Sequence, residues 1–98
     1  MKDYITLVQE DVRLAILEVL EAAPDYSHNS GTITSFLSNL GFKIDRDECH
    51  KQMEWLKKRG LISVEYVCDM RKGLLTDRGE DLVLGRLRVD GVARKKRV

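Results

Sequence analysis

The run "IDRDECHKQMEWLKKRGLISVEYV", residues 44–67, restricts the fold more than any other part of the chain. Asp45 followed by Glu48 is a D-x-x-E capping box, which predicts that a helix begins there. Basic residues at 57–59 suit the negative end of that helix, and Gly60 suits the left-handed residue that stops it. Residues 62–67 alternate β-branched and aromatic side chains with others, which predicts a strand. A capped helix, a stop and a strand therefore follow one another directly.

The sequence after this run predicts a hairpin and a last helix. A loop "CDMRKG" and a short returning strand "LLT" would complete the hairpin, with Arg71 and Lys72 near its tip. Thr76 or Asp77 would then cap a helix over residues 77–87, where Asp77 and Glu80 form a second D-x-x-E pair.

Two helices are predicted before residue 44. Residues 6–23 carry apolar side chains at helical spacing, and Pro24 ends the helix. The apolar surface is wider than one stripe, which indicates either a central core helix or a second contact such as a homodimer. A short helix is expected over residues 31–40, with Asn29 or Ser30 as its N-cap and Gly41 as its stop.

The predicted order is helix, helix, turn, helix, hairpin, helix. A chain of 98 residues fits one small domain. The economical packing of these elements is a mainly α fold with a small β-hairpin (α+β), a winged helix-turn-helix. We expect a winged-helix domain over residues 1–87 and a basic, flexible C-terminal tail over residues 88–98.

Charge is distributed unevenly along the chain. The net charge is +1, but residues 86–98 hold six basic residues and one acidic residue, so the other 85 residues sum to −4. This pattern fits an anion-seeking arm on a mildly acidic domain, and it equally fits a solvated chain end.

Several classes of protein are not expected. No apolar run approaches the length that spans a bilayer, and "MKDYITLVQED" is not a secretory signal, so a cytoplasmic protein without membrane contact is expected. Cys49 and Cys68 lie far apart, as free thiols would, and no ligand spacing indicates a metal. No motif places a nucleophile beside a base and no phosphate loop appears, so neither an enzyme nor a cofactor is expected.

Three segments carry a resemblance: "EDVRLAILEVL…APDYS", "LGFKIDRDECHKQMEWLKKRGLISVE" and "LTDRGEDLVLGRLRVDGVARKKR". Over nearly its whole length the chain resembles small proteins of Mu-like bacteriophages and prophages that are often labelled ArsR-like transcriptional regulators. Asp90 stands where members of this family commonly have proline. The resemblance implies a winged helix, a phage origin and a role in transcription regulation.

The helix over residues 45–59 would be the recognition helix of such a fold. The N-terminal half of a recognition helix reaches the base edges, and it carries here three residues of the types that bind them: Arg46, His50 and Lys51. Asp47 and Glu54 count against this role because carboxylates repel phosphates. The face therefore either reads DNA or serves as a solvated or protein-binding surface.

Other basic residues complete the predicted site. Arg71 and Lys72 of the wing would contact phosphate or a minor groove, or belong to an ordinary loop. Trp55 is interpreted as an edge-of-core residue in preference to a base-stacking platform. The expected partner is double-stranded DNA, and the alternative is a phage or host protein bound by a protein-interaction module. The candidate DNA-binding residues are Arg46, His50, Lys51, Lys57, Lys58, Arg71, Lys72, Arg94, Lys95, Lys96 and Arg97.

Overall fold

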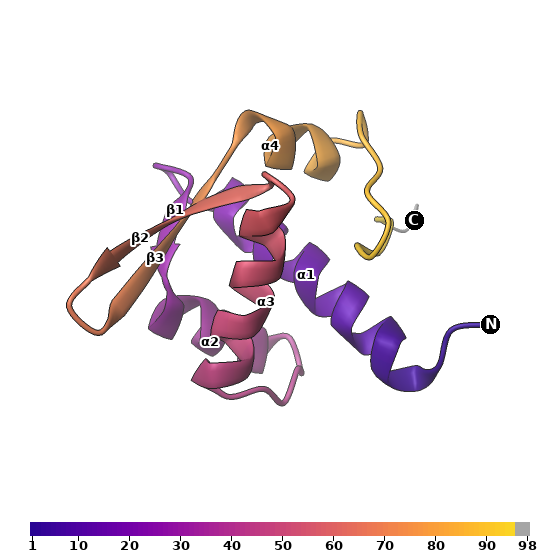
Figure 1. The fold of residues 1–98 in the computed structure, drawn as a ribbon, viewed down its shortest axis with the longest axis horizontal. Coiled ribbons are helices and arrows are strands. Elements are labelled where there is room, and N and C mark those ends of the chain that lie inside the picture. The colour runs from indigo at the N-terminus through magenta and orange to yellow at the C-terminus, as the bar shows by residue number, and fades with distance from the viewer. Residues whose placement is uncertain (96–98) are drawn as a thin grey trace.

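A computed structural model describes residues 1–95. These residues form four helices and a three-stranded antiparallel sheet (Figure 1). The helices α2 (Ser30–Asn39) and α3 (Arg46–Lys58) make the helix-turn-helix, and the strands β2 (Ile62–Val67) and β3 (Met70–Leu75) make the wing. The predicted winged helix is thereby confirmed. The elements in chain order are α1 (Tyr4–Ala22), β1 (Ser27–Asn29), α2 (Ser30–Asn39), α3 (Arg46–Lys58), β2 (Ile62–Val67), β3 (Met70–Leu75) and α4 (Asp77–Val83).

Each helix begins at a side-chain cap. The capping oxygens accept a hydrogen bond from the backbone N–H three residues later, which satisfies one orphan donor of the first turn. The caps are Asp3, Asn29, Asp45 and Thr76.

The two predicted D-x-x-E boxes form only in part. Asp45 accepts from the backbone of Glu48 at 2.8 Å, but the Glu48 carboxylate instead accepts from the amide of Gln52 at 2.6 Å. At the last helix Thr76 is the cap, so Asp77 is the first helical residue and does not act as a cap.

The core surrounds the C-terminal half of α1. Leu14 and Leu17, which widen the apolar surface of this helix, are both buried within the domain, as a central core helix requires. The predicted core face of α3 is confirmed, because Cys49, Met53 and Leu56 are fully buried. The other fully buried apolar side chains include Ile16, Leu20, Ile33, Leu37 and Leu61.

The hairpin is longer and its turn tighter than predicted. Val67 pairs with Met70, so only Cys68 and Asp69 form the turn, and Cys68 has a φ of 56°. The predicted loop "CDMRKG" was therefore wrong. Arg71 and Lys72 lie within β3, because strand pairing continues to the turn and satisfies their backbone groups.

Strand β3 is the central strand, since it also pairs with β1. Ser27 lies opposite Leu74 and Asn29 opposite Lys72. This third strand was not predicted, because a three-residue polar segment carries no hydrophobic alternation. It joins the start of α2 directly to the wing.

The last helix is shorter than predicted. It ends at Val83, and Gly85 adopts a φ of 82°, which breaks the helical path that the apolar pattern continued to Leu87. Gly79 allows α4 to approach the chain at the start of β2. A Cβ atom on Gly79 would lie 2.1 Å from the carbonyl oxygen of Leu61.

The segment after α4 returns over α1. Val92 is buried in the core, and the N–H of Ala93 donates to the carbonyl of Glu10 at 3.2 Å. The division into a domain over residues 1–87 and a flexible tail stays a prediction, although Val92 packs with the domain. Within residues 1–95, no helix combines the length and the apolar character needed to cross a membrane.

Candidate nucleic-acid interface

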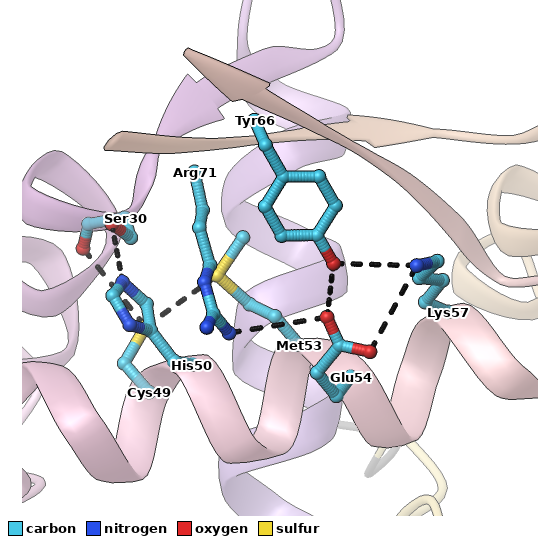
Figure 2. A network of polar contacts seen from close by, with 8 residues as sticks. All are labelled: Ser30, Cys49, His50, Met53, Glu54, Lys57, Tyr66 and Arg71. Carbon is cyan, nitrogen blue, oxygen red and sulfur yellow. Dashed lines mark hydrogen bonds and ion pairs between the residues drawn. The ribbon is translucent and has the colours of Figure 1, made fainter. Parts of the chain in front are cut away.

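A network of polar side chains joins α3 to the wing (Figure 2). The hydroxyl of Tyr66 on β2 donates to Glu54 of α3, and the ammonium of Lys57 donates to the Tyr66 oxygen at 3.2 Å. Glu54 also lies 3.9 Å from Lys57 and 3.9 Å from Arg71 of β3. The network thus fixes the position of both hairpin strands relative to the outward face of α3.

Glu54 disfavours DNA binding by this face less than its negative charge alone suggests. The hydrogen bond from Tyr66, followed by the nearby charges of Lys57 and Arg71, lowers the pKa of Glu54. The carboxylate therefore stays ionised, with two cations beside it. Tyr66 was missed as a site residue, although its alternation with Ile62 and Val64 placed it on the strand face toward α3.

His50 is half-buried and held by α2. Its Nε2 atom shares a hydrogen bond of 2.8 Å with the hydroxyl of Ser30, which is itself buried. Burial, followed by the charge of Arg71, lowers the pKa of His50, so the ring is neutral at pH 7. Only its Nδ1 atom is left for another partner.

The two cysteines are free, and their surroundings differ. Cys49 is buried, with its sulfur 3.9 Å from the carbonyl of Ser30 and 3.9 Å from the sulfur of Met53. Burial raises the pKa of this thiol, which keeps it protonated. Cys68 is exposed at the hairpin turn. Nowhere in residues 1–95 do three or more potential ligands of the His, Cys, Asp and Glu types gather as a metal site.

Three basic side chains of α3 have no carboxylate partner within residues 1–95, and all three are exposed. They are Arg46, Lys51 and Lys58. Arg46 lies beside Gly31 in the first turn of α2. Lys72 of β3 is half-buried and likewise unpaired among these residues. Free cations thus remain at both ends of α3 and on the wing.

The tail does not join this face within the described residues. Lys95 lies 4.0 Å from Glu18 of α1, and the chain around Arg94 runs beside α1, toward the opposite end of the molecule from the hairpin tip (Figure 1). The candidates Lys96 and Arg97 lie outside the described residues.

Trp55 packs at the edge of the core, as predicted. The guanidinium carbons of Arg13 and Arg59 lie 3.9 Å and 3.5 Å from its ring centre, and Gly91 lies against its edge. Two guanidinium groups this close must cover opposite faces of the indole, which leaves no face for a base to stack on. Arg13 also donates to Gln52 at 2.7 Å and to the carbonyl of Gly91 at 2.9 Å.

A second surface lies between α1 and the start of α3. The first turns of α1 are exposed, with Tyr4 80% and Ile5 68% accessible. A groove of about 210 Å³ lies between the two helices and has a mainly apolar lining. Its lining residues include Tyr4, Ile5, Val8, Val12 and Ile44.

A helix-turn-helix followed by a hairpin that packs against the second helix defines a winged-helix protein. The chain belongs to the family of a protein of Escherichia phage Mu, "Uncharacterized protein gp26". The two are 33% identical over 90 residues, which cover 92% of this chain and 93% of the Mu protein. An uncharacterized protein of Haemophilus influenzae is 35% identical over 63 residues, covering 64% of this chain and 61% of that protein. No protein-family model matches the chain.

Two solved structures share the fold. They are the complex structures of hsRosR-S1 and hsRosR-S4. Both superpose with a TM-score of 0.63, and their sequence identities to this chain are 20% and 17%, respectively. The superpositions cover 74% and 80% of this chain, and 64% and 72% of the RosR chains. The predicted relationship to Mu-like phage proteins is confirmed, whereas the ArsR-like label stays a prediction.

Proposed function

We propose that this protein is a DNA-binding winged-helix protein that regulates transcription of phage or prophage genes. The observation that carries the proposal is the network of Glu54, Tyr66, Lys57 and Arg71. It holds the wing against α3, and free cations near both ends of α3 stay accessible. Helices in this position of a helix-turn-helix enter the major groove, where a fixed second element sets their depth and angle.

Each basic residue has a part in this proposal. Arg46 and Lys51 reach base edges, as does His50 through its free Nδ1 atom. Lys57 and Lys58 contact phosphates near the C-terminal end of α3, and Arg71 and Lys72 contact the backbone from the wing. The tail carries Arg94, Lys95, Lys96 and Arg97. Since Lys95 lies beside Glu18 of α1 and away from the wing, the tail would contact phosphates on a separate stretch of DNA and add affinity that does not depend on sequence.

A homodimer is part of the proposal. Helix-turn-helix dimers read two half-sites roughly 34–36 Å apart, which multiplies the sequence information of one short helix. The exposed N-terminal turns of α1 offer apolar side chains for pairing, among them Tyr4 and Ile5. The protein acts without an enzymatic step, in the cytoplasm, where the phage DNA lies during infection.

Fluorescence anisotropy tests the proposal. Labelled duplexes that tile the DNA around the gene of this protein are titrated at several salt concentrations. We expect tight binding to particular fragments, and we expect Arg46→Ala to weaken it by about 1–3 kcal/mol on those fragments alone. Arg86→Ala is the matched control, because it removes one exposed cation that belongs neither to α3 nor to the wing and lies beside Asp81.

The result that contradicts the proposal is equally specific. Weak binding that disappears for all fragments alike as salt rises means that only unspecific charge contacts meet DNA. An equal loss for Arg46→Ala on every fragment rejects the base-reading role of this residue.

The groove between α1 and α3 favours a second candidate function, that of a protein-interaction module in phage development. Its apolar lining and the carboxylate of Glu48 suit a phage or host protein better than a nucleic acid. Ile5→Asp separates the two functions when DNA binding is measured on a single half-site, which one protomer occupies without its dimer partner. The substitution should abolish binding of a protein partner and leave half-site binding unchanged.

A further inference from the structure

The outward face of α3 holds two kinds of polar side chain. His50, Glu54 and Lys57 already have partners within the domain, namely Ser30 and Tyr66 (Figure 2). Four others form no hydrogen bond or ion pair through their side chains within residues 1–95, and all are exposed. These four are Arg46, Asp47, Lys51 and Lys58. Three of the four lie in the first two turns, which is the part of a recognition helix that reaches base edges.

The three free side chains in the first two turns all suit the G·C base pair. Arg and Lys donate to the O6 and N7 atoms of guanine, and a carboxylate accepts from the N4 amino group of cytosine. Arg46, Lys51 and Asp47 therefore offer two guanine donors and one cytosine acceptor. Since Asp47 directly follows Arg46, the two lie on adjacent parts of the first turn, within reach of neighbouring base pairs.

On α3 itself, the groups that would recognise A·T pairs are occupied or buried. Adenine is read by Asn or Gln, but Gln52 is only 2% exposed and is held between Arg13 and Glu48. Asn29 accepts from the backbone of Thr32 as the cap of α2. Thymine is read through its methyl group, but the apolar side chains of α3 are buried in the core, apart from Trp55, whose faces are covered.

We infer that the first turns of α3 select G·C base pairs, with Arg46 and Lys51 on guanine and Asp47 on the amino group of cytosine. The inference rests on the proposed DNA binding and adds its sequence preference. The inference also explains why an acidic residue, whose charge disfavours DNA binding in general, stands at position 47. The carboxylate repels phosphates at every site, and only a correctly placed cytosine offsets that repulsion. Asp47 is thus a specificity-determining residue.

Selection from a library of duplexes with a randomised core tests the inference. The native protein should enrich sites with a block of G·C pairs. Asp47→Asn should replace cytosine by adenine at one position of the selected site, because the amide of Asn pairs with N6 and N7 of adenine. We expect the preference at that position to change by roughly 5- to 150-fold. Asp11→Asn, an exposed acid on α1, is the matched control and should leave the selected site unchanged.

Two further measurements keep the outcomes distinct. The Asp47→Ala variant should bind nonspecific DNA more tightly and lose the preference for cytosine at the same position of the site. Circular dichroism verifies that both Asp47 variants fold. Selection of A·T-rich sites, or the same cytosine preference in Asp47→Asn, overturns this inference while DNA binding stands. An absence of any enriched sequence in the native protein overturns the proposed function itself.

Discussion

Replacing Gly79 by alanine is expected to destabilise the protein, although alanine is the better helix former. The added Cβ would lie 2.1 Å from the Leu61 carbonyl oxygen and 2.7 Å from a methyl group of Leu75. Real Cβ atoms essentially never approach closer than 3.0 Å, so α4 would have to move away from the start of β2 by roughly 1 Å. Backbone atoms cannot rotate out of the way, as the end of a long side chain would.

The magnitude follows from two opposing effects. Overpacking costs about 1–3 kcal/mol, and a clash with backbone belongs at the upper end of that range. The gain in helix propensity is about 1 kcal/mol. The unfolding free energy should therefore fall by about 2 kcal/mol, which corresponds to a decrease in Tm of roughly 8–16 °C for a domain of this size.

Urea unfolding followed by the fluorescence of Trp55 measures this loss. Gly31→Ala is the control, because that glycine also lies in a helix and its Cβ would meet only side-chain atoms, at 3.3 Å and 3.4 Å. We expect the control to remain within about 0.5 kcal/mol of the native protein, because the gain in helix propensity offsets the tight contact of the new Cβ with Asn29 Oδ1. A midpoint for Gly79→Ala at or above the native value would refute the reasoning, because propensity alone would then govern the position.

Two further predictions concern the network between α3 and the wing. Tyr66→Phe removes the hydroxyl that donates to Glu54, so the pKa of Glu54 should rise in an NMR titration, and the free energy of unfolding should fall by about 0.5–1 kcal/mol. An unchanged pKa of Glu54 would show that this hydrogen bond does not form. Because the folded state lowers the pKa of His50, the unfolded chain binds its proton first, and stability should decrease as the pH falls below about 6.5. His50→Gln should remove this part of the pH dependence, and identical pH profiles for both proteins would exclude the effect.

The sequence predicted most of the fold, because its signals were local. Caps at Asn29 and Asp45 and left-handed glycines at positions 41 and 60 fixed the helix boundaries to within a residue or two. What escaped prediction depended on pairing between distant segments. β1 is polar and short, and only the backbone of β3 makes it a strand. The length of the hairpin turn likewise follows from strand register, which a run such as "CDMRKG" does not specify.

The candidate site was predictable as a set of residue types but not as an arrangement. The positions of free cations on α3 followed from helical spacing. The bond between His50 and Ser30 joins residues 20 positions apart, and the bond between Tyr66 and Glu54 joins two elements whose packing angle is a property of the whole core. The sequence alone therefore could not distinguish side chains that are available to DNA from side chains that already hydrogen-bond within the domain.

The pairing of β1 with β3 has a consequence for the order of folding. The β2–β3 hairpin closes across a turn of two residues, whereas Ser27 and Leu74 are 47 positions apart. Closing so long a loop costs more chain entropy, and contacts of this kind form slowly. The hairpin is therefore available early, and its attachment to β1, which leads directly into α2, comes late. The complete surface of helix and wing thus assembles in a late, cooperative step of folding.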